Sequence, residues 1–307
     1  MSSFISQVYK GNNSFMSYFL TLLITFIFWQ ILGMIPLVGT ALYYAGDYAT
    51  FVSSAADQWM SIGIPKTLYF LMMLVSFAFG FLGLWLGITQ IHKRPLKTAL
   101  TSRAQFDWNR FFFALFFWGA VVVVSGLVDY MSRPEEFELI FDLKKFAALA
   151  VVALIFVPIQ TSFEELMFRG YFMQALGGLS KNRWLPLIVT SVIFGLLHGA
   201  NPEVTKLGSI ILVYYIGTGF LFGIMTLMDE GLELAMGFHA VNNVIAALFI
   251  TTNWTVFQTD AILMDMAEPE VDWQIFVPVF ILYPIILYVL GRKYGWSNWK
   301  EKLVGKI

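Results

Sequence analysis

Three short segments of this apolar chain carry acids, imidazoles and amides at spacings that could support chemistry. The segments are 163–171, 194–198 and 239–243, and each interrupts a long apolar stretch. The side chains that could act are Glu164, Glu165, Arg169, His198, His239 and Asn243. An ionisable group in hydrocarbon costs at least about 2.5 kcal/mol, so such groups mark a functional site by default. The sequence therefore predicts a buried polar site built from three separate segments.

The two adjacent glutamates are expected to have different roles. Neighbours on a helix lie about 100° apart, so Glu164 and Glu165 cannot point the same way. Glu165 lies four residues before Arg169, the favoured order for an ion pair along a helix. Glu164 is expected over Phe168 and Tyr171, on a less polar face that suits a general base. This pattern predicts an ion-paired Glu165 and a reactive Glu164.

His239 and Asn243 are also four residues apart, which places an imidazole and an amide on one helix face. Such a pair could donate hydrogen bonds to the oxyanion that forms during hydrolysis of an amide. Counting from the connecting loops puts Glu164 and His198 at a similar depth, roughly 18 to 21 Å along their helices. His239 and Asn243 come to roughly 11 to 17 Å from the same side. The three segments are therefore expected to meet in one layer.

Composition identifies the environment. Of the 307 residues, 58% are apolar and only 13% are charged, which is typical of a membrane protein. A formal net charge of -1 and the absence of a basic patch argue against nucleic acid as a partner. The chain has no cysteine, which excludes disulfides, thiol proteases and thiolate metal sites.

Eight apolar segments could form membrane helices, which predicts an all-α, polytopic helical bundle. They cover about 11–46, 67–91, 111–128, 146–176, 184–198, 207–228, 232–252 and 273–291. We expect residues 1–145 to act as a scaffold, 146–252 to form the catalytic core, and 253–307 to hold an acidic loop, the last span and a basic tail.

The alternation of cations between loops predicts the orientation. Cations gather after the second span and after the last one, as Lys93, Arg94, Lys97, Arg103, Arg110, Arg292, Lys293, Lys300, Lys302 and Lys306. The loop before the last span carries acids alone, namely Asp260, Asp265, Glu268, Glu270 and Asp272. Both termini are therefore expected in the cytoplasm, with the chain integral to a membrane that we take to be the bacterial cytoplasmic membrane.

At these residues the chain resembles the CPBP family, which comprises CAAX-protease and bacteriocin-processing (Abi) intramembrane peptidases related to the CAAX-prenyl endopeptidase. The resemblance covers about 161–243 and rests on three patterns in family order. They are EExxxR at Glu164, Glu165 and Arg169, FxxxH at Phe194 and His198, and HxxxN at His239 and Asn243. It implies that Glu164 and His198 activate the attacking water, that His239 and Asn243 stabilise the oxyanion, and that Glu165 and Arg169 support the site. The implied activity is endopeptidase cleavage of a membrane-tethered peptide or protein.

A metal site is the alternative chemistry. Glu164, His198 and His239 could form a zinc set with water in the fourth position. The His-Glu-x-x-His pattern of zinc metalloproteases is absent, so we favour a reaction without a metal or any other cofactor.

Two other classes of function stay open. A proton-coupled transporter also holds Glu and His near the membrane midplane, but such folds usually show repeated halves, and no repeat is evident here. A non-catalytic scaffold or a bacteriocin-immunity protein could keep the same fold, although the intact motifs argue against it. Outside the motifs, His92 is expected to be a solvated loop residue, Asn242 a packing residue, and the many Phe and Trp side chains lipid-facing bulk or interfacial anchors.

Overall fold

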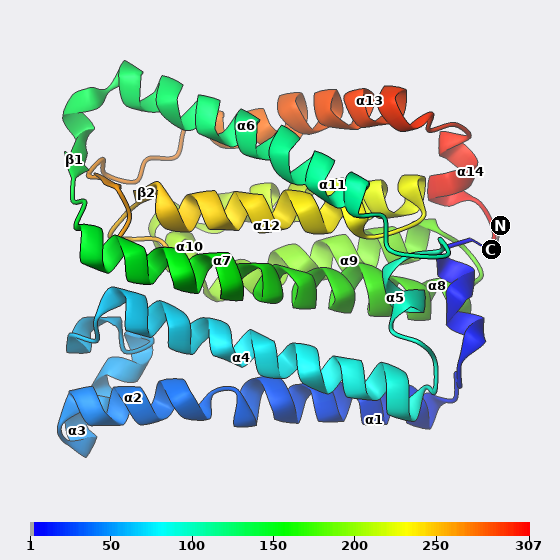
Figure 1. Ribbon diagram of the computed structural model, residues 1–307, viewed down its shortest axis with the longest axis horizontal. Helices are drawn as coiled ribbons and strands as arrows, with labels where there is room; N and C mark the ends of the chain where they lie inside the picture. Colours follow the sequence, from blue (N-terminus) through cyan, green and yellow to red (C-terminus); the bar gives the residue numbers. More distant parts are fainter. Residues whose placement is uncertain (1–2) are drawn as a thin grey trace.

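The computed structural model describes residues 3–307, and nearly all of its regular structure is helical. The membrane helices run side by side along one direction (Figure 1). This confirms the predicted all-α membrane bundle. In the described part of the chain, six helices are long and apolar enough to span a membrane. They cover Phe15–Ala45, Lys66–Ile91, Trp108–Ser132, Leu143–Ser180, Ser209–Asp229 and Trp273–Tyr294.

The remaining two of the eight expected spans are shorter helices. Residues Trp184–Ala200 form a short apolar helix, and α12 spans Glu233–Leu248. At a rise of about 1.5 Å per residue, 16 residues reach only about 24 Å, less than the hydrocarbon thickness. The α12 helix is nevertheless almost fully buried over its first half, so protein rather than lipid surrounds it.

The long spans are composed of several helical pieces. The first comprises α1 (Phe15–Phe26), a π-helical turn (Ile27–Leu32) and α2 (Ile35–Ala45). The second comprises α4 (Lys66–Leu86) and a π-helical turn (Gly87–Ile91), and α6 (Trp108–Ser132) forms the third. The fourth comprises α7 (Leu143–Glu165), a π-helical turn (Leu166–Phe172) and α8 (Met173–Ser180). Then follow α9 (Trp184–Leu197), α11 (Leu212–Asp229) and α13 (Tyr283–Tyr294).

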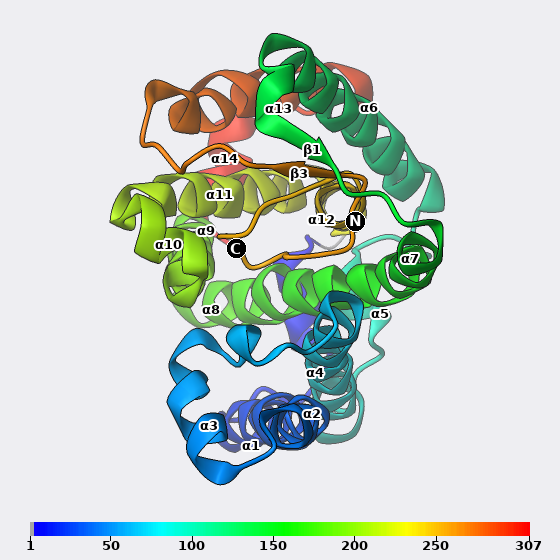
Figure 2. The ribbon, with the colours of Figure 1, turned by 90° about the vertical axis from the view of Figure 1, so that its left-hand side faces the viewer.

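Short elements lie at the two ends of the bundle. Four are short helices: α3 (Tyr48–Ser53), α5 (Lys97–Leu100), α10 (Pro202–Leu207) and α14 (Trp299–Val304). Three short strands, β1 (Phe137–Leu139), β2 (Ile250–Thr251) and β3 (Leu263–Asp265), form a sheet in the order β1-β3-β2. The β1 strand is antiparallel to β3, and β2 is parallel to it. This sheet and its loops cross the end of the bundle that faces the viewer in Figure 2.

The α12 helix lies in the middle of the bundle, where it packs against α6, α7 and α11. One apolar core joins α6, α11, α12 and α13, and a second joins α4, α7 and α12. The first span and α4 form an outer layer on one side, which the rest of the bundle contacts mainly through α4 and α7 (Figures 1 and 2). The arrangement therefore surrounds the residues of α12 with the helices that carry the other two motifs.

The expectation that His92 is a solvated loop residue is wrong. Its side chain is only 1% exposed. After the second span the chain folds back, so that His92 Nδ1 lies 2.6 Å from the Asn12 carbonyl and Nε2 lies 2.9 Å from the Tyr171 hydroxyl. Through His92, the basic loop thus connects the residues just before the first span to the π-helical turn that follows α7.

Acidification is expected to weaken the fold through His92. Burial lowers the pKa of His92, the nearby Arg94 lowers it further, and the hydrogen bond to the Asn12 carbonyl partly opposes this effect. The other titratable groups that face the ring are the phenols of Tyr18 and Tyr171. Below pH about 6.5 the unfolded chain binds a proton that the folded chain resists. Neutral His92 therefore makes its full contribution to the stability of the fold above pH about 6.5. This contribution is lost as the pH falls toward the pKa of His92 in the folded protein.

Thermal unfolding of the purified protein in detergent, followed from pH 7.5 to pH 5, tests this expectation. The melting temperature of the wild type should fall with pH more steeply than that of His92→Gln, which keeps a hydrogen-bonding side chain but does not titrate. Parallel curves for the two proteins would show that His92 has no such effect.

Candidate active site

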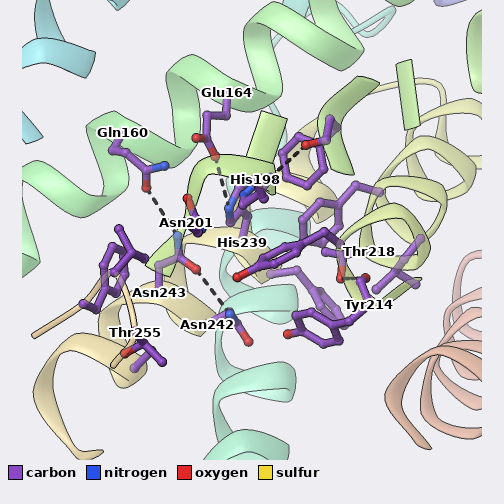
Figure 3. Close-up of a pocket in the computed structure, with 18 of the residues that line it drawn as sticks. Gln160, Glu164, His198, Asn201, Tyr214, Thr218, His239, Asn242, Asn243 and Thr255 are labelled. Atoms are coloured by element: carbon purple, nitrogen blue, oxygen red, sulfur yellow. Dashed lines mark hydrogen bonds and ion pairs between the residues drawn. The ribbon is translucent and has the colours of Figure 1, made fainter. Parts of the chain in front are cut away.

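A partly enclosed cavity of about 380 Å³ lies between α4, α6, α7, α9, α11, α12 and α13 and the loop that follows β2. Glu164, His198, His239 and Asn243 all line it (Figure 3). These residues come from three motifs that are far apart in the sequence, so their predicted convergence is confirmed. Glu165 and Arg169 do not line the cavity. They are fully buried behind it.

The expected ion pair between Glu165 and Arg169 is present. Arg169 Nη1 donates to Glu165 Oε1 at 2.9 Å, and Arg169 Nη2 donates to the Gly219 carbonyl at 3.2 Å. The guanidinium also lies over the ring of Phe194, 4.2 Å from its centre. The contacts cross the point where α7 changes to π-helical winding, a local geometry that often accompanies functional sites.

Glu165 has a second partner that the sequence did not predict. His239 Nδ1 lies 2.8 Å from Glu165 Oε1. Because Arg169 compensates Glu165, we treat Glu165 as an ionised carboxylate that can only accept, so the proton of this hydrogen bond belongs to Nδ1. The other ring nitrogen of His239 is then directed toward Glu164. The pair Glu165 and Arg169 therefore orients the imidazole.

The carboxylate of Glu164 faces His239. Glu164 Oε2 lies 3.5 Å from His239 Nε2 and, among the described residues, has no hydrogen-bond partner. The expectation that Glu164 lies over Tyr171 is wrong, since the Tyr171 hydroxyl is directed to His92 Nε2 and Tyr171 does not line the cavity. The wider winding that begins at Leu166 changes the angular position of the residues that follow.

His198 lines the same cavity and lies at the end of α9. Its Nδ1 lies 2.8 Å from the Phe194 carbonyl, which can only accept, so Nδ1 carries the proton and Nε2 is left as an acceptor. The ring stacks on Tyr215 with 4.2 Å between ring centres. The Tyr215 hydroxyl in turn hydrogen-bonds to the buried Glu203. Tyr215 and Glu203 were missed because no spacing within one helix links them to His198.

Amide side chains complete the polar wall. Asn243 Nδ2 donates to Gln160 Oε1 at 3.3 Å, and Asn242 Nδ2 donates to Asn243 Oδ1 at 3.2 Å. Trp118 Nε1 donates to Asn242 Oδ1 at 3.2 Å. Asn242 is thus more than a packing residue, and Trp118, which is 8% exposed, is not lipid-facing. Gln160 could have been noticed, because it precedes Glu164 by one helical turn.

The geometry offers a carboxylate, two imidazoles and an amide around one cavity. Such groups can accept a proton from water and donate hydrogen bonds to an oxyanion. Among residues 3–307, no three His, Asp or Glu side chains are grouped so that they could hold a metal ion. We therefore derive no step through the alternative zinc set of Glu164, His198 and His239.

Fold and cavity together define a helical integral membrane protein with a buried carboxylate and imidazole site. Residues 144–245, from α7 to α12, match the family model described as Rce1-like, type II CAAX prenyl endopeptidase. This match confirms the family resemblance that the three motifs carry. Over 284 residues the chain is 29% identical to the uncharacterized protein YyaK of Bacillus subtilis (strain 168), an alignment that covers 92% of this chain and 93% of that protein. No solved structure gives a significant match.

Proposed function

We propose that this protein is an intramembrane endopeptidase that cleaves membrane-tethered peptides or proteins with a water molecule activated by glutamate and histidine. One observation carries the proposal. Glu164, His198, His239 and Asn243 share a single cavity, and all four lie in the segment that matches an endopeptidase family model. A scaffold or an immunity protein would not need these groups to converge.

In the proposed reaction, a water molecule binds between Glu164 and His198. Glu164 takes a proton from the water while the water oxygen attacks the carbon of the peptide carbonyl. The π electrons of the carbonyl move onto the carbonyl oxygen. The resulting C–O⁻ group accepts hydrogen bonds from Asn243 and from His239. Glu164 then returns the proton to the leaving amine as the C–N bond breaks. The products are a carboxylic acid and an amine, and no co-reactant other than water is consumed.

The charges around His239 support its role as a donor. Glu164 and Glu165 contribute two negative charges, and Arg169 contributes one positive charge. To donate to an oxyanion, His239 needs a proton on Nε2 as well as on Nδ1, and with both protons this four-residue group would carry no net charge. Nε2 is the ring nitrogen that lies on the side of Glu164, 3.5 Å from Glu164 Oε2.

The cavity lining indicates the class of substrate. Apart from Glu164 and the two histidines, the lining side chains are uncharged, and many are aromatic or aliphatic, such as Phe77, Phe222 and Phe238. A charged substrate residue beside the scissile bond would lose its hydration without gaining a partner. We therefore propose that the cleaved segment is apolar and reaches the site from the bilayer.

We further propose that the chain lies in the bacterial cytoplasmic membrane with both termini in the cytoplasm. The first described residues and α14 lie at the end of the bundle that also carries α5, which belongs to the basic second loop (Figure 1). The acids of the last loop lie at the other end, near β3. This separation follows the rule that cytoplasmic loops collect Lys and Arg.

Comparative membrane proteomics tests the proposed function. Membranes of cells that express the wild type should contain a processed membrane peptide whose new terminus is absent in cells that express Glu164→Gln. A matched variant at an exposed acid on β1, Glu138→Gln, should process the same peptide as the wild type. Identical sets of termini in wild type and Glu164→Gln would refute peptidase activity.

A further inference from the structure

Four side chains on the cavity wall are joined in series by three hydrogen bonds. The series begins at the indole of Trp118 and ends at the amide oxygen of Gln160. Trp118 Nε1 donates to Asn242 Oδ1 at 3.2 Å, and Asn242 Nδ2 donates to Asn243 Oδ1 at 3.2 Å. Asn243 Nδ2 then donates to Gln160 Oε1 at 3.3 Å. The two bonds at Asn243 are drawn in Figure 3. We call these four residues the amide chain.

The direction of the amide chain is set at its indole end. An indole N–H can only donate, whereas an amide can present either its oxygen or its nitrogen. Asn242 must therefore turn Oδ1 toward Trp118, which leaves Nδ2 of Asn242 to face Asn243. Asn243 must in turn present Oδ1 to Asn242. Its Nδ2 group is then directed toward Gln160 and the cavity.

The indole that sets this direction is held firmly. Trp118 is 8% exposed and stacks on Phe238, with 5.1 Å between ring centres and 18° between ring planes. Phe238 is 1% exposed and immediately precedes His239 on α12. The indole is thus packed against the helix that carries both proposed oxyanion donors.

The orientation of Asn243 decides whether it helps or hinders the reaction. One N–H of its Nδ2 group bonds to Gln160, and the second is left for a ligand in the cavity. If the amide were reversed, a carbonyl oxygen would face the developing oxyanion and repel it. An oxyanion donor acts because it is already oriented before the charge develops.

We propose that Trp118 and Asn242 are positioning residues that hold the Asn243 amide with its Nδ2 group toward the scissile carbonyl. This inference rests on the proposed endopeptidase function. Neither residue is a defining position of the three sequence motifs, and the Trp118 N–H is linked to the Asn243 amide through Asn242. Their effect should therefore fall on the chemical step and disappear when Asn243 is removed.

The test uses the full-length protein in phosphatidylethanolamine and phosphatidylglycerol vesicles. The probe is a pool of lipid-anchored, internally quenched peptides with apolar residues on both sides of the scissile bond. Trp118→Phe keeps the ring that stacks on Phe238 but removes the N–H. Because one hydrogen bond biases an orientation about two- to tenfold, kcat should fall by about that factor while KM stays unchanged.

A double-mutant cycle separates positioning from packing. In the Asn243→Ala background, Trp118→Phe should cause no further loss of kcat, since no amide is left to orient. A packing defect would lower kcat by the same factor in both backgrounds. Trp85→Phe is the matched control, because Trp85 lies on α4 with 42% of its surface exposed and should behave as the wild type.

Asn242→Leu interrupts the amide chain and leaves the indole of Trp118 unchanged. It is the variant to use if Trp118→Phe does not fold. It should lower kcat about two- to tenfold, again only when Asn243 is present. Wild-type kcat in both variants, or an equal loss in both backgrounds, would overturn the inference while leaving the endopeptidase proposal intact. Equal turnover by wild type and Glu164→Gln would instead refute the endopeptidase proposal itself, and the inference with it.

Discussion

Replacing Glu164 by Gln is expected to lower kcat by about 10²- to 10⁴-fold, the usual contribution of a general base. Gln has nearly the same shape as Glu, so the cavity should keep its walls and KM should change little. The carboxylate is well placed for this effect, since Glu164 Oε2 is buried, lines the cavity and lacks a hydrogen-bond partner among the described residues. An amide in its place cannot accept the proton of water.

The measurement is cleavage of the lipid-anchored peptide pool by purified protein in vesicles, with the melting temperature recorded in parallel. Glu138→Gln, at an exposed site on β1, should keep the turnover of the wild type. A Glu164→Gln protein that turns over at the rate of the wild type would show that another group activates the water. Addition of a strong chelator should leave wild-type turnover unchanged, because the proposed steps use no metal.

Replacing Arg169 by Met is expected to destabilise the protein by about 3–5 kcal/mol, the usual cost of removing one partner of a buried ion pair. The side chains of Arg169 and Glu165 are both 0% exposed. Without the guanidinium, the Glu165 carboxylate would remain buried near Glu164 with only His239 as a partner. The cost therefore comes mainly from the charge that is left behind.

The double variant Glu165→Gln with Arg169→Met should recover part of this stability. It removes both charges, and the Gln oxygen can still accept the hydrogen bond from His239 Nδ1. Unfolding of the purified proteins in mixed micelles measures both effects. Arg292→Met, at an exposed site near the end of α13, should stay within about 0.5 kcal/mol of the wild type. An Arg169→Met protein as stable as the wild type would mean that the ion pair contributes nothing to the fold.

Several predictions from the sequence depended only on local geometry, and these are confirmed. The pairing of Glu165 with Arg169 follows from their spacing of four residues, and it survives the change from α to π winding. The meeting of the three motifs followed from counting residues to the connecting turns. The all-α membrane architecture followed from long apolar stretches, because hydrocarbon leaves a backbone few alternatives to a helix.

Other predictions were wrong, one because it extended regular helical geometry too far and two because they inferred the surroundings of a side chain from its neighbours or its residue type. Tyr171 was placed below Glu164 on the assumption of 3.6 residues per turn, but π winding between them directs it to His92 instead. His92 itself was assigned to solvent from its charged neighbours, although the folded loop buries it. Trp118 was counted among lipid-facing aromatics, and no local pattern distinguishes it from the exposed Trp85.

The sequence by itself determined that the chain lies in a lipid bilayer, where its helices are and which side chains could act. Composition and the spacing of residues along one helix are enough to fix these features. Only the tertiary structure decided which nitrogen of His239 faces Glu164, which way the Asn243 amide points, and that Tyr215 supports His198. The physical reason is that a hydrogen bond between helices depends on how the helices are rotated and offset against each other. Packing across the whole bundle sets that arrangement, and no spacing along a single helix encodes it.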